Sequence, residues 1–251
     1  MKSKDNLNSV WDKYYKKSSR NTILKDDNFF RLEIQAILEQ IKSYIQRKKT
    51  IKILELGSGS GYLASKICSN LLKNISYDYT AIDFSEEAVT KAKKRKIKNC
   101  TFIKNDFSDF LKNSDDVYDI IISQRSIMAI MNQNQQKKLL ILIKKHMKQN
   151  SIGIFSEVTQ QAFKKIQTLR RKIKLPPLEK VWHSRYLDET LLSRIFKHSK
   201  IIDFSSTYWL VTRVIYPFFE EPKHNSIIHK FAFNLSQEGD YGLVKLFIVK
   251  K

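Results

Sequence analysis

The chain has 251 residues, of which 46 are Lys or Arg and 25 are Asp or Glu, giving a formal net charge of +21. A hydrophobic content of 42%, with 12% aromatic residues, excludes an intrinsically disordered protein and suffices for a buried core in a chain of this length. No apolar run approaches the length of a membrane span, and the first residues lack the apolar segment of a signal peptide. We therefore expect a cytoplasmic protein.

The positive charge has two interpretations. A polyanion such as RNA is one partner that would explain it. The basic residues, however, fall in small groups on several predicted helices, and no basic stripe interleaved with aromatic residues follows the chain, as a groove for a nucleic acid strand requires. We expect mainly solvated helix faces, with nucleic acid as the less favoured partner.

The first 49 residues are expected to form a helical N-terminal segment. Trp11, Tyr14 and Tyr15 lie at helical spacing, on about one face of a first helix. A second helix is predicted at residues 27–46, where apolar residues recur. For Trp11 we expect packing against the rest of the domain.

A cluster of three of the chain's six glycines follows a short buried strand, predicted at residues 51–56. The glycines are Gly57, Gly59 and Gly61, and a helix is predicted directly after them at residues 62–71. A strand, a glycine turn and a helix in this order direct free backbone N–H groups toward a ligand. Glycine is needed because the chain turns sharply where a ligand approaches the backbone.

Two further strands, predicted at residues 77–82 and 100–104, each end close to an acidic residue. Asp83 follows the first of them directly, and Asp106 and Phe107 follow the second. A carboxylate at a strand end suits a ribose diol because it accepts two hydrogen bonds at once. An acid next to an aromatic ring suits the edge and face of adenine. The pattern predicts a nucleoside site.

The run from Glu55 to Gly61, together with Asp83 and Asp106, resembles the first motif and the ribose- and adenine-binding acids of class I S-adenosylmethionine-dependent methyltransferases. The resemblance covers roughly residues 50–160. It implies a Rossmann-like α/β fold with a seven-stranded, mostly parallel sheet, an antiparallel last strand and a helical N-terminal lid. It also implies S-adenosylmethionine as cofactor and S-adenosylhomocysteine as product. The cofactor-binding residues that it implies are Glu55, Gly57, Ser58, Gly59, Gly61, Asp83, Phe84, Asp106, Phe107 and Gln124.

A dinucleotide-binding dehydrogenase is the main alternative. Its fingerprint is G-x-G-x-x-G, whereas the third glycine here, Gly61, comes one residue early. The sequence also lacks an N-P-P-Y motif and a proline-cysteine nucleophile, which counts against methylation of DNA bases. We therefore favour a methyltransferase with another acceptor.

The remaining elements complete one domain at residues 50–251. Strands are predicted at residues 117–123, 151–158, 201–211 and 243–249, and helices at residues 86–96, 133–147, 160–174, 189–198 and 225–235. Residues 159–187 are expected to form an insert that shapes the substrate site.

Two side chains are candidates for removing a proton from an acceptor. His183 lies in a connection that concentrates indole, imidazole, guanidinium and phenol groups, and histidine needs the least tuning to act as a base near neutral pH. A structural role for its ring is the alternative. Glu157 lies near the end of a predicted strand, where α/β sheets carry their chemistry, and its alternative is structural hydrogen bonding.

Arginines and tyrosines are candidates for binding the acceptor. Four further runs are loosely similar to methyltransferases of bacterial surface-polysaccharide clusters: W-x-x-Y-Y near the N-terminus, H-x-R-Y-L-D-E from His183, T-R-V-x-Y-P, and a late G-D-Y-x-x-x-K-L-F. This similarity implies O-methylation of a sugar hydroxyl on a nucleotide-activated or polysaccharide precursor. The sequence departs from well-marked sugar methyltransferases in lacking an obvious D-D or H-x-D metal set. The alternatives are an RNA methyltransferase and a cofactor-binding subunit without activity. The expected substrate-binding residues are Tyr14, Arg125, Arg185, Tyr186, Tyr208 and Arg213, and no metal site is expected.

Overall fold

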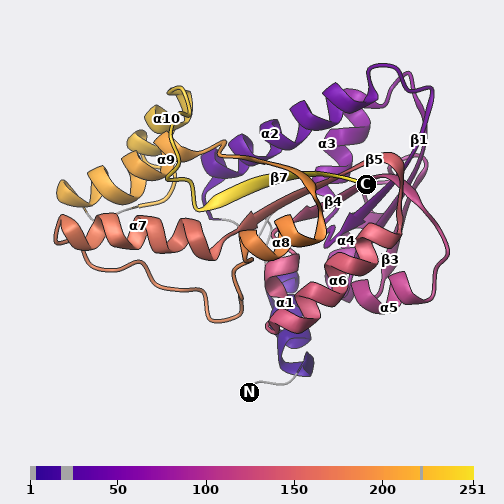
Figure 1. Cartoon of the computed structure of the whole chain (residues 1–251), viewed down its shortest axis with the longest axis horizontal. Coiled ribbons are helices and arrows are strands. Elements are labelled where there is room, and N and C mark those ends of the chain that lie inside the picture. The colour runs from indigo at the N-terminus through magenta and orange to yellow at the C-terminus, as the bar shows by residue number, and fades with distance from the viewer. Residues whose placement is uncertain (1–3, 18–24, 221–222) are drawn as a thin grey trace.

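The computed structural model describes residues 4–17, 25–220 and 223–251 (Figure 1). Its centre is a seven-stranded sheet in the order β3-β2-β1-β4-β5-β7-β6. Strands β1 to β5 are parallel to one another, and β7 is antiparallel to both β5 and β6. The strands are β1 Thr50–Leu56, β2 Ser76–Asp83, β3 Cys100–Lys104, β4 Tyr118–Gln124, β5 Met147–Val158, β6 His198–Ile202 and β7 Val244–Lys250. The predicted mostly parallel sheet with an antiparallel last strand is confirmed.

Helices cover both faces of this sheet. Side chains of β1 alternate between two hydrophobic cores, with Ile53 in one and Leu54 in the other, as the pleat of a strand requires. The first core includes side chains of α2, α3 and α4, and the second includes side chains of α5, α6 and α8. The helices are α1 Lys4–Lys17, α2 Asp27–Ile45, α3 Tyr62–Leu71, α4 Glu86–Lys93, α5 Phe107–Lys112, α6 Gln133–Lys145, α7 Gln160–Lys172, α8 Glu189–Ile195, α9 Ser206–Leu210 and α10 Ile227–Asn234.

A second group of helices, α7, α9 and α10, lies beyond one end of the sheet (Figure 1). A π-helical turn, η2 Val211–Ile215, continues α9 and packs through Val214 against Ile166 of α7. A 3₁₀ turn, η3 Tyr216–Phe218, follows it. Within the described ranges, no helix combines the length and hydropathy that crossing a membrane requires.

The prediction of one long strand at residues 201–211 is wrong. β6 ends at Ile202, and Asp203 then turns the chain by accepting hydrogen bonds from the backbone N–H of Ser205 at 3.1 Å and of Gly242 at 2.8 Å. The residues that follow are helical, and Tyr208 is fully buried there. Aromatic and β-branched residues favour strands only weakly, so tertiary packing decides the structure of this segment.

The first helix is fastened to the domain across α4. The hydroxyl of Ser85, the N-cap of α4, donates to Asp12 at 2.5 Å, and Lys91 of α4 donates to the backbone carbonyl of Tyr15. This attachment places the last turns of α1 beside the carboxyl ends of β1 and β2. That α1 acts as a lid stays a prediction.

Candidate active site

The turn between β1 and α3 has a backbone that only glycine adopts easily. Gly57, Gly59 and Gly61 have φ angles of 78°, 52° and 71°, all in the left-handed region. A Cβ atom on Gly57 would lie 1.9 Å from the hydroxyl oxygen of Ser126, and one on Gly59 would lie 2.6 Å from that of Tyr15. The absent side chains leave the backbone of this turn open to a ligand.

The glycine turn forms one wall of a cavity with an empty volume of about 700 Å³, part of which is open to solvent. The carboxyl ends of β1, β2 and β4 contribute to it, together with α1, α2 and α3. This is the sheet edge at which open α/β folds bind ligands. The lining residues are Trp11, Tyr15, Phe30, Gly57, Ser58, Gly59, Ser60, Tyr62, Leu63, Asp83, Phe84, Phe107, Gln124, Arg125, Ser126 and Ala129.

Asp83 is the acidic side chain in this lining. Its carboxylate accepts hydrogen bonds from the backbone N–H of Gly59 at 2.8 Å and of Ser85 at 2.9 Å. Burial raises the pKa of Asp83 to about 6, against the lowering effect of these hydrogen bonds, so the group is ionised at neutral pH. Phe84 and Phe107 line the same cavity and offer flat apolar surface beside the carboxylate.

The residues present fit S-adenosylmethionine. Asp83 suits the ribose hydroxyls, and Phe84 and Phe107 suit the adenine ring. The hydroxyl of Ser58 is buried in the lining and has no hydrogen-bond partner among the described residues, so a polar ligand group would satisfy it. When bound, S-adenosylmethionine supplies a methyl group on a positively charged sulfur, which is already activated for transfer.

Three residues expected at the cofactor lie just outside the lining. Glu55 is buried under the turn and accepts a hydrogen bond from the hydroxyl of Tyr79 at 2.8 Å; burial raises its pKa to about 8. Asp106 is the N-cap of α5 and accepts from the backbone N–H of Ser108 at 2.9 Å. Gly61 faces Phe102, at the start of α3. These positions support the glycine turn and α5 rather than the cavity surface.

Arg125, which we expected to bind the acceptor, lies in the cavity lining. Its guanidinium Nε donates to the carboxylate of Glu33 on α2 at 3.2 Å, and Gln124 donates to the same carboxylate at 2.7 Å. Glu33 is fully buried and sequence reasoning missed it. The signal was present, because Glu33 is an acid among the apolar residues of a predicted helix, and such an acid needs a buried partner.

The N-terminal helix contributes more than the sequence suggested. Trp11 and Tyr15 both line the cavity, whereas we had expected Trp11 to pack against the domain. Tyr14 is outside the lining and contacts Tyr15 edge-on, with ring centroids 5.8 Å apart. Two of the three aromatic residues of the predicted stripe therefore face the cavity, and Tyr14, which we expected to bind the acceptor, does not line it.

His183 is not among the lining residues, but it contacts Trp11, which lines the cavity. Its ring contacts Trp11 edge-on at a centroid distance of 5.0 Å and Trp182 at 5.2 Å. Its Nδ1 is buried without a hydrogen-bond partner among the described residues. Desolvation lowers the pKa of His183, so the imidazole is neutral at pH 7 and able to accept a proton.

Glu157, the second candidate base, has a structural position instead. Its buried carboxylate accepts four hydrogen bonds at 2.7–3.1 Å, all from groups at the end of β4 or directly after it. The donors are the hydroxyl of Ser123 and the backbone N–H groups of Ser126, Ile127 and Met128. Burial raises the pKa of Glu157 to about 7. The group is outside the cavity lining and anchors the turn that carries Arg125 and Ser126.

Two of the expected acceptor-binding residues belong to the connection before α8. Arg185 donates through Nη2 to Gln133 at 3.1 Å, and its backbone N–H bonds the carbonyl of Met128 at 2.8 Å. Tyr186 is buried against the ring of Phe163, at a centroid distance of 5.1 Å. Neither residue lines the cavity, and Tyr186 packs as a core residue.

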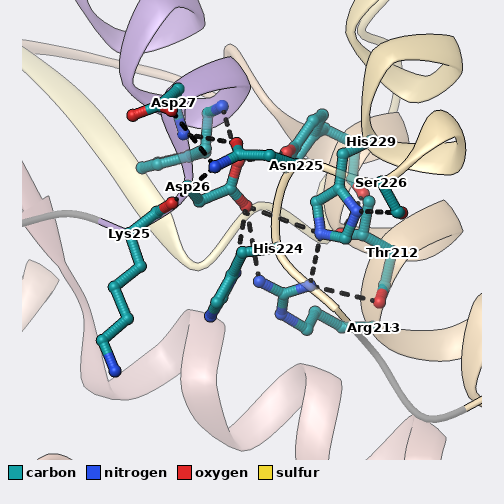
Figure 2. A network of polar contacts seen from close by, with 11 residues as sticks. Lys25, Asp26, Asp27, Thr212, Arg213, His224, Asn225, Ser226 and His229 are labelled. Carbon is teal, nitrogen blue, oxygen red and sulfur yellow. Dashed lines mark hydrogen bonds and ion pairs between the residues drawn. The ribbon is translucent and has the colours of Figure 1, made fainter.

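The expectation that Tyr208 and Arg213 bind the acceptor is not supported by their surroundings. Both donate to the carboxylate of Asp26, the N-cap of α2, Tyr208 at 2.5 Å and Arg213 at 3.4 Å. Figure 2 shows Arg213 between Asp26 and His229, whose Nε2 lies 3.2 Å from Arg213 Nη1. A buried guanidinium requires a counterion, so this network joins α2 to η2 and α10.

Asp26, His224 and His229 also place one ligand atom each within 4.8 Å of one another, close enough for a metal ion. Arg213 contacts both Asp26 and His229 and so puts a fixed cation in the same place (Figure 2). The nitrogen Nδ1 of His229 is also engaged, by the hydroxyl of Ser226 at 2.9 Å. The guanidinium of Arg213 beside both Asp26 and His229 repels a second cation, so this cluster does not favour a resident metal.

Comparisons with known proteins identify the family of this chain. A model of the family described as "methyltransferase domain" matches residues 47–203. The malonyl-[acyl-carrier protein] O-methyltransferase of Bacillus cytotoxicus is 31% identical over 131 residues, which are 52% of this chain and 43% of that protein. The chain thus spans less than half of that relative.

Solved structures show the same fold at low sequence identity. The N-methyltransferase NodS of Bradyrhizobium japonicum WM9, in complex with S-adenosylhomocysteine, has a TM-score of 0.58 at 13% identity and covers 97% of both chains. The plantazolicin methyltransferase BpumL, in complex with a substrate analogue and S-adenosylhomocysteine, has a TM-score of 0.56 at 19% identity, over 97% of this chain and 95% of that one.

The family match covers more than half of the chain, and it includes the glycine turn, Asp83 and the ends of β4 and β5. The Rossmann-like sheet and the cavity with its nucleoside-binding features occur in the same region. The chain belongs to the methyltransferase domain family, as a class I member that uses S-adenosylmethionine.

Proposed function

We propose that this protein transfers the methyl group of S-adenosylmethionine to a hydroxyl oxygen of a small polar acceptor. A sugar hydroxyl on a nucleotide-activated or polysaccharide precursor is the acceptor class to test first. The observation that carries the proposal is the position of His183, a neutral imidazole that contacts Trp11 at the cavity with an unpartnered Nδ1.

A hydroxyl acceptor must lose its proton as the methyl group arrives. A neutral imidazole accepts that proton well near pH 7, and a positioned base of this kind contributes roughly a hundredfold to ten-thousandfold in rate. The His183 ring contacts the rings of Trp11 and Trp182, with interplanar angles of 85° and 86°. The remaining task of the chain is to align the acceptor oxygen with the transferred carbon.

The names of the relatives support a second candidate acceptor, a carboxylate on an acyl carrier. The Bacillus cytotoxicus and Bacillus anthracis proteins are both malonyl-[acyl-carrier protein] O-methyltransferases. A carboxylate is already ionised at pH 7 and has no proton to lose. His183 would then contribute little to the rate, which distinguishes the two candidates by experiment.

The test is methyl transfer from isotope-labelled S-adenosylmethionine to a panel of nucleotide sugars, polysaccharide precursors, acyl-carrier thioesters with a free carboxylate, and RNA. The labelled product is identified by mass spectrometry. His183→Gln is measured beside His198→Gln, which alters an exposed histidine of β6. A sugar acceptor with a kcat loss of roughly a hundredfold in His183→Gln alone supports the proposal.

Two other outcomes contradict it. Methylation of the acyl-carrier carboxylates alone, with full activity of His183→Gln, favours the second candidate. Cofactor binding without methylation of any member of the panel favours a partner-binding subunit without activity.

A further inference from the structure

Arg125 is the only cationic side chain among the residues that line the cavity in the described part of the chain. It follows β4 directly, and its side chain is only 12% exposed. Its φ angle of 57° is in the left-handed region, which residues other than Gly, Asn and Asp adopt rarely. A buried cation on an unusual backbone, at a ligand cavity, indicates that the position serves the ligand.

Glu33 fixes the near side of this guanidinium. The Glu33 carboxylate accepts from Arg125 Nε at 3.2 Å, from Gln124 Nε2 at 2.7 Å and from the hydroxyl of Ser156 at 2.6 Å. The backbone N–H of Arg125 bonds the carbonyl of Ser156 at 2.7 Å. Glu33 is fully buried, so these hydrogen bonds stabilise its negative charge. The Glu33 carboxylate in turn fixes the orientation of the Arg125 guanidinium plane.

The two terminal nitrogens of the Arg125 guanidinium differ from Nε, which is bonded to Glu33. Nη1 and Nη2 of Arg125 have no hydrogen-bond partner within the ranges that the structure describes, and these two nitrogens form the edge that pairs with a carboxylate in the bidentate geometry. We infer that Arg125, positioned by Glu33, is a carboxylate subsite for the amino-acid end of S-adenosylmethionine. The inference rests on the cofactor of the family and assigns it a second polar contact.

The order of the strands supports this placement. β1 and its glycine turn lie between β2, which ends at Asp83, and β4, which Arg125 follows directly. Gly57 is so close to the chain after Arg125 that a Cβ atom there would meet Ser126. The cavity thus has its acid on one side of the turn and its cation on the other, as a ligand with a diol at one end and a carboxylate at the other requires.

The acceptor is the other source of an anionic group, and burial argues against it. The acceptor must enter and leave past the open rim, whereas Arg125 is largely enclosed behind Glu33 and Gln124. An enclosed cation suits the ligand that fills the depth of the cavity. The two sources are separated by measuring cofactor binding without any acceptor.

The experiment is calorimetric titration of the purified full chain with S-adenosylhomocysteine and with its decarboxylated analogue. The variant is Arg125→Gln, and the control is Arg171→Gln, an exposed arginine of α7. We expect Arg125→Gln to weaken S-adenosylhomocysteine roughly tenfold to a hundredfold, the effect of a charge-assisted hydrogen-bond pair, and to leave the analogue within about twofold of the wild type.

Glu33 is tested as a positioning residue by Glu33→Gln, beside Glu39→Gln at an exposed position of the same helix. Glu33→Gln keeps the size of the side chain and removes its charge. We expect a loss for S-adenosylhomocysteine alone, of roughly threefold to tenfold, because Arg125 keeps its charge but loses its fixed plane. A thermal unfolding curve confirms that each variant is folded.

Equal losses for both ligands in Arg125→Gln would mean that the residue only shapes the cavity, and this would overturn the inference. Unchanged affinity for both ligands would overturn it as well, and a change confined to the KM of an acceptor would reassign Arg125 to the acceptor. If the wild type bound neither ligand, the cofactor assignment itself would fail, which is a different result from a failure of the subsite.

Discussion

The hydroxyl oxygen of Tyr15, on the N-terminal helix, lies 2.6 Å from the position that a Cβ atom on Gly59 would occupy. The N-terminal helix therefore rests on the middle glycine of the turn, and the two elements have no space for a side chain between them. Gly59 also has a φ of 52°, so its backbone conformation and its contact with Tyr15 both require glycine.

We expect Gly59→Ala to weaken S-adenosylhomocysteine by at least roughly tenfold and to lower the free energy of unfolding by about 1 kcal/mol, because the new Cβ meets both Tyr15 and an unfavourable φ. Adding Tyr15→Phe removes the oxygen in contact and should restore part of the affinity. Calorimetry and urea unfolding measure the two effects. Wild-type affinity in Gly59→Ala would show that Tyr15 moves aside freely.

Asp83 makes cofactor binding depend on pH. Its pKa is raised to about 6 by burial, so the carboxylate that would accept two ribose hydrogen bonds is present above pH 6 and is lost below it. The affinity for S-adenosylhomocysteine should fall severalfold between pH 7.5, about 1.5 units above this pKa, and pH 5.5, about 0.5 unit below it. Asp83→Asn should bind weakly at both. An equally steep pH dependence in Asp83→Asn would assign the titration to another group.

Local sequence patterns identified the part of the fold that binds the cofactor. The helix predicted at residues 62–71 is α3, Tyr62–Leu71, and the glycine turn before it has the conformation that its composition requires. Strand, turn and helix here depend on neighbouring residues, so the sequence pattern carries the information. Asp83 was found for the same reason, as an acid at a strand end.

Contacts between distant segments could not be predicted in this way. Tyr208 and Arg213 bond Asp26 across 182 and 187 residues, and no spacing rule connects such positions. Their aromatic and cationic side chains looked like an acceptor site because buried networks and ligand sites use the same residue types. Glu33 is different, because an acid on the apolar side of a predicted helix is visible in the sequence and predicts a buried partner.

Glu55 should make the stability of the fold fall as the pH rises. Burial raises its pKa to about 8, well above the unfolded value, so the folded state holds a proton that the unfolded state has released. Its stabilising contribution is complete below the unfolded pKa and is lost as pH rises through the folded pKa. We expect the free energy of unfolding to drop by roughly 1 kcal/mol per pH unit between these two values.

Glu55→Gln should remove much of that slope, because glutamine stays neutral and its amide oxygen still accepts from Tyr79. Urea unfolding at several pH values from acid to mildly alkaline measures this. Glu39→Gln, at an exposed position of α2, is the control and should retain the wild-type slope. A wild-type slope in Glu55→Gln as well would mean that other buried carboxyls dominate the pH dependence.

Arg213 should matter for stability rather than for acceptor binding. Arg213→Met removes the guanidinium beside Asp26 (Figure 2). Asp26 then stays buried at the start of α2 with its charge only partly compensated, by hydrogen bonds such as that from Tyr208. We expect a loss of about 3 kcal/mol in the free energy of unfolding, with cofactor affinity unchanged in the folded fraction. Urea unfolding beside Arg171→Met tests this. Unchanged stability with a raised acceptor KM would return Arg213 to the acceptor site.

We expect different roles for Glu157 and His183, the first as a structural carboxylate and the second as the catalytic base. Glu157→Gln cannot accept all four hydrogen bonds that the carboxylate accepts, because an amide NH₂ replaces one of the two oxygens. This NH₂ group then faces donors, either the N–H of Met128 or the three groups that bond the other oxygen. We expect about 2 kcal/mol of destabilisation from the unsatisfied donors. His183→Gln should remain as stable as the wild type within about 1 kcal/mol, since its Nδ1 has no partner to lose.

The rate measurement completes this comparison. With a hydroxyl acceptor, His183→Gln should lower kcat while Glu157→Gln, measured below its unfolding temperature, lowers it less. The reverse order, a stable Glu157→Gln protein with the larger loss in kcat, would make Glu157 the base. In that case the turn after β4 would have to open in the complex, because no acceptor atom reaches a carboxylate that Ser123, Ser126 and the next two backbone N–H groups enclose.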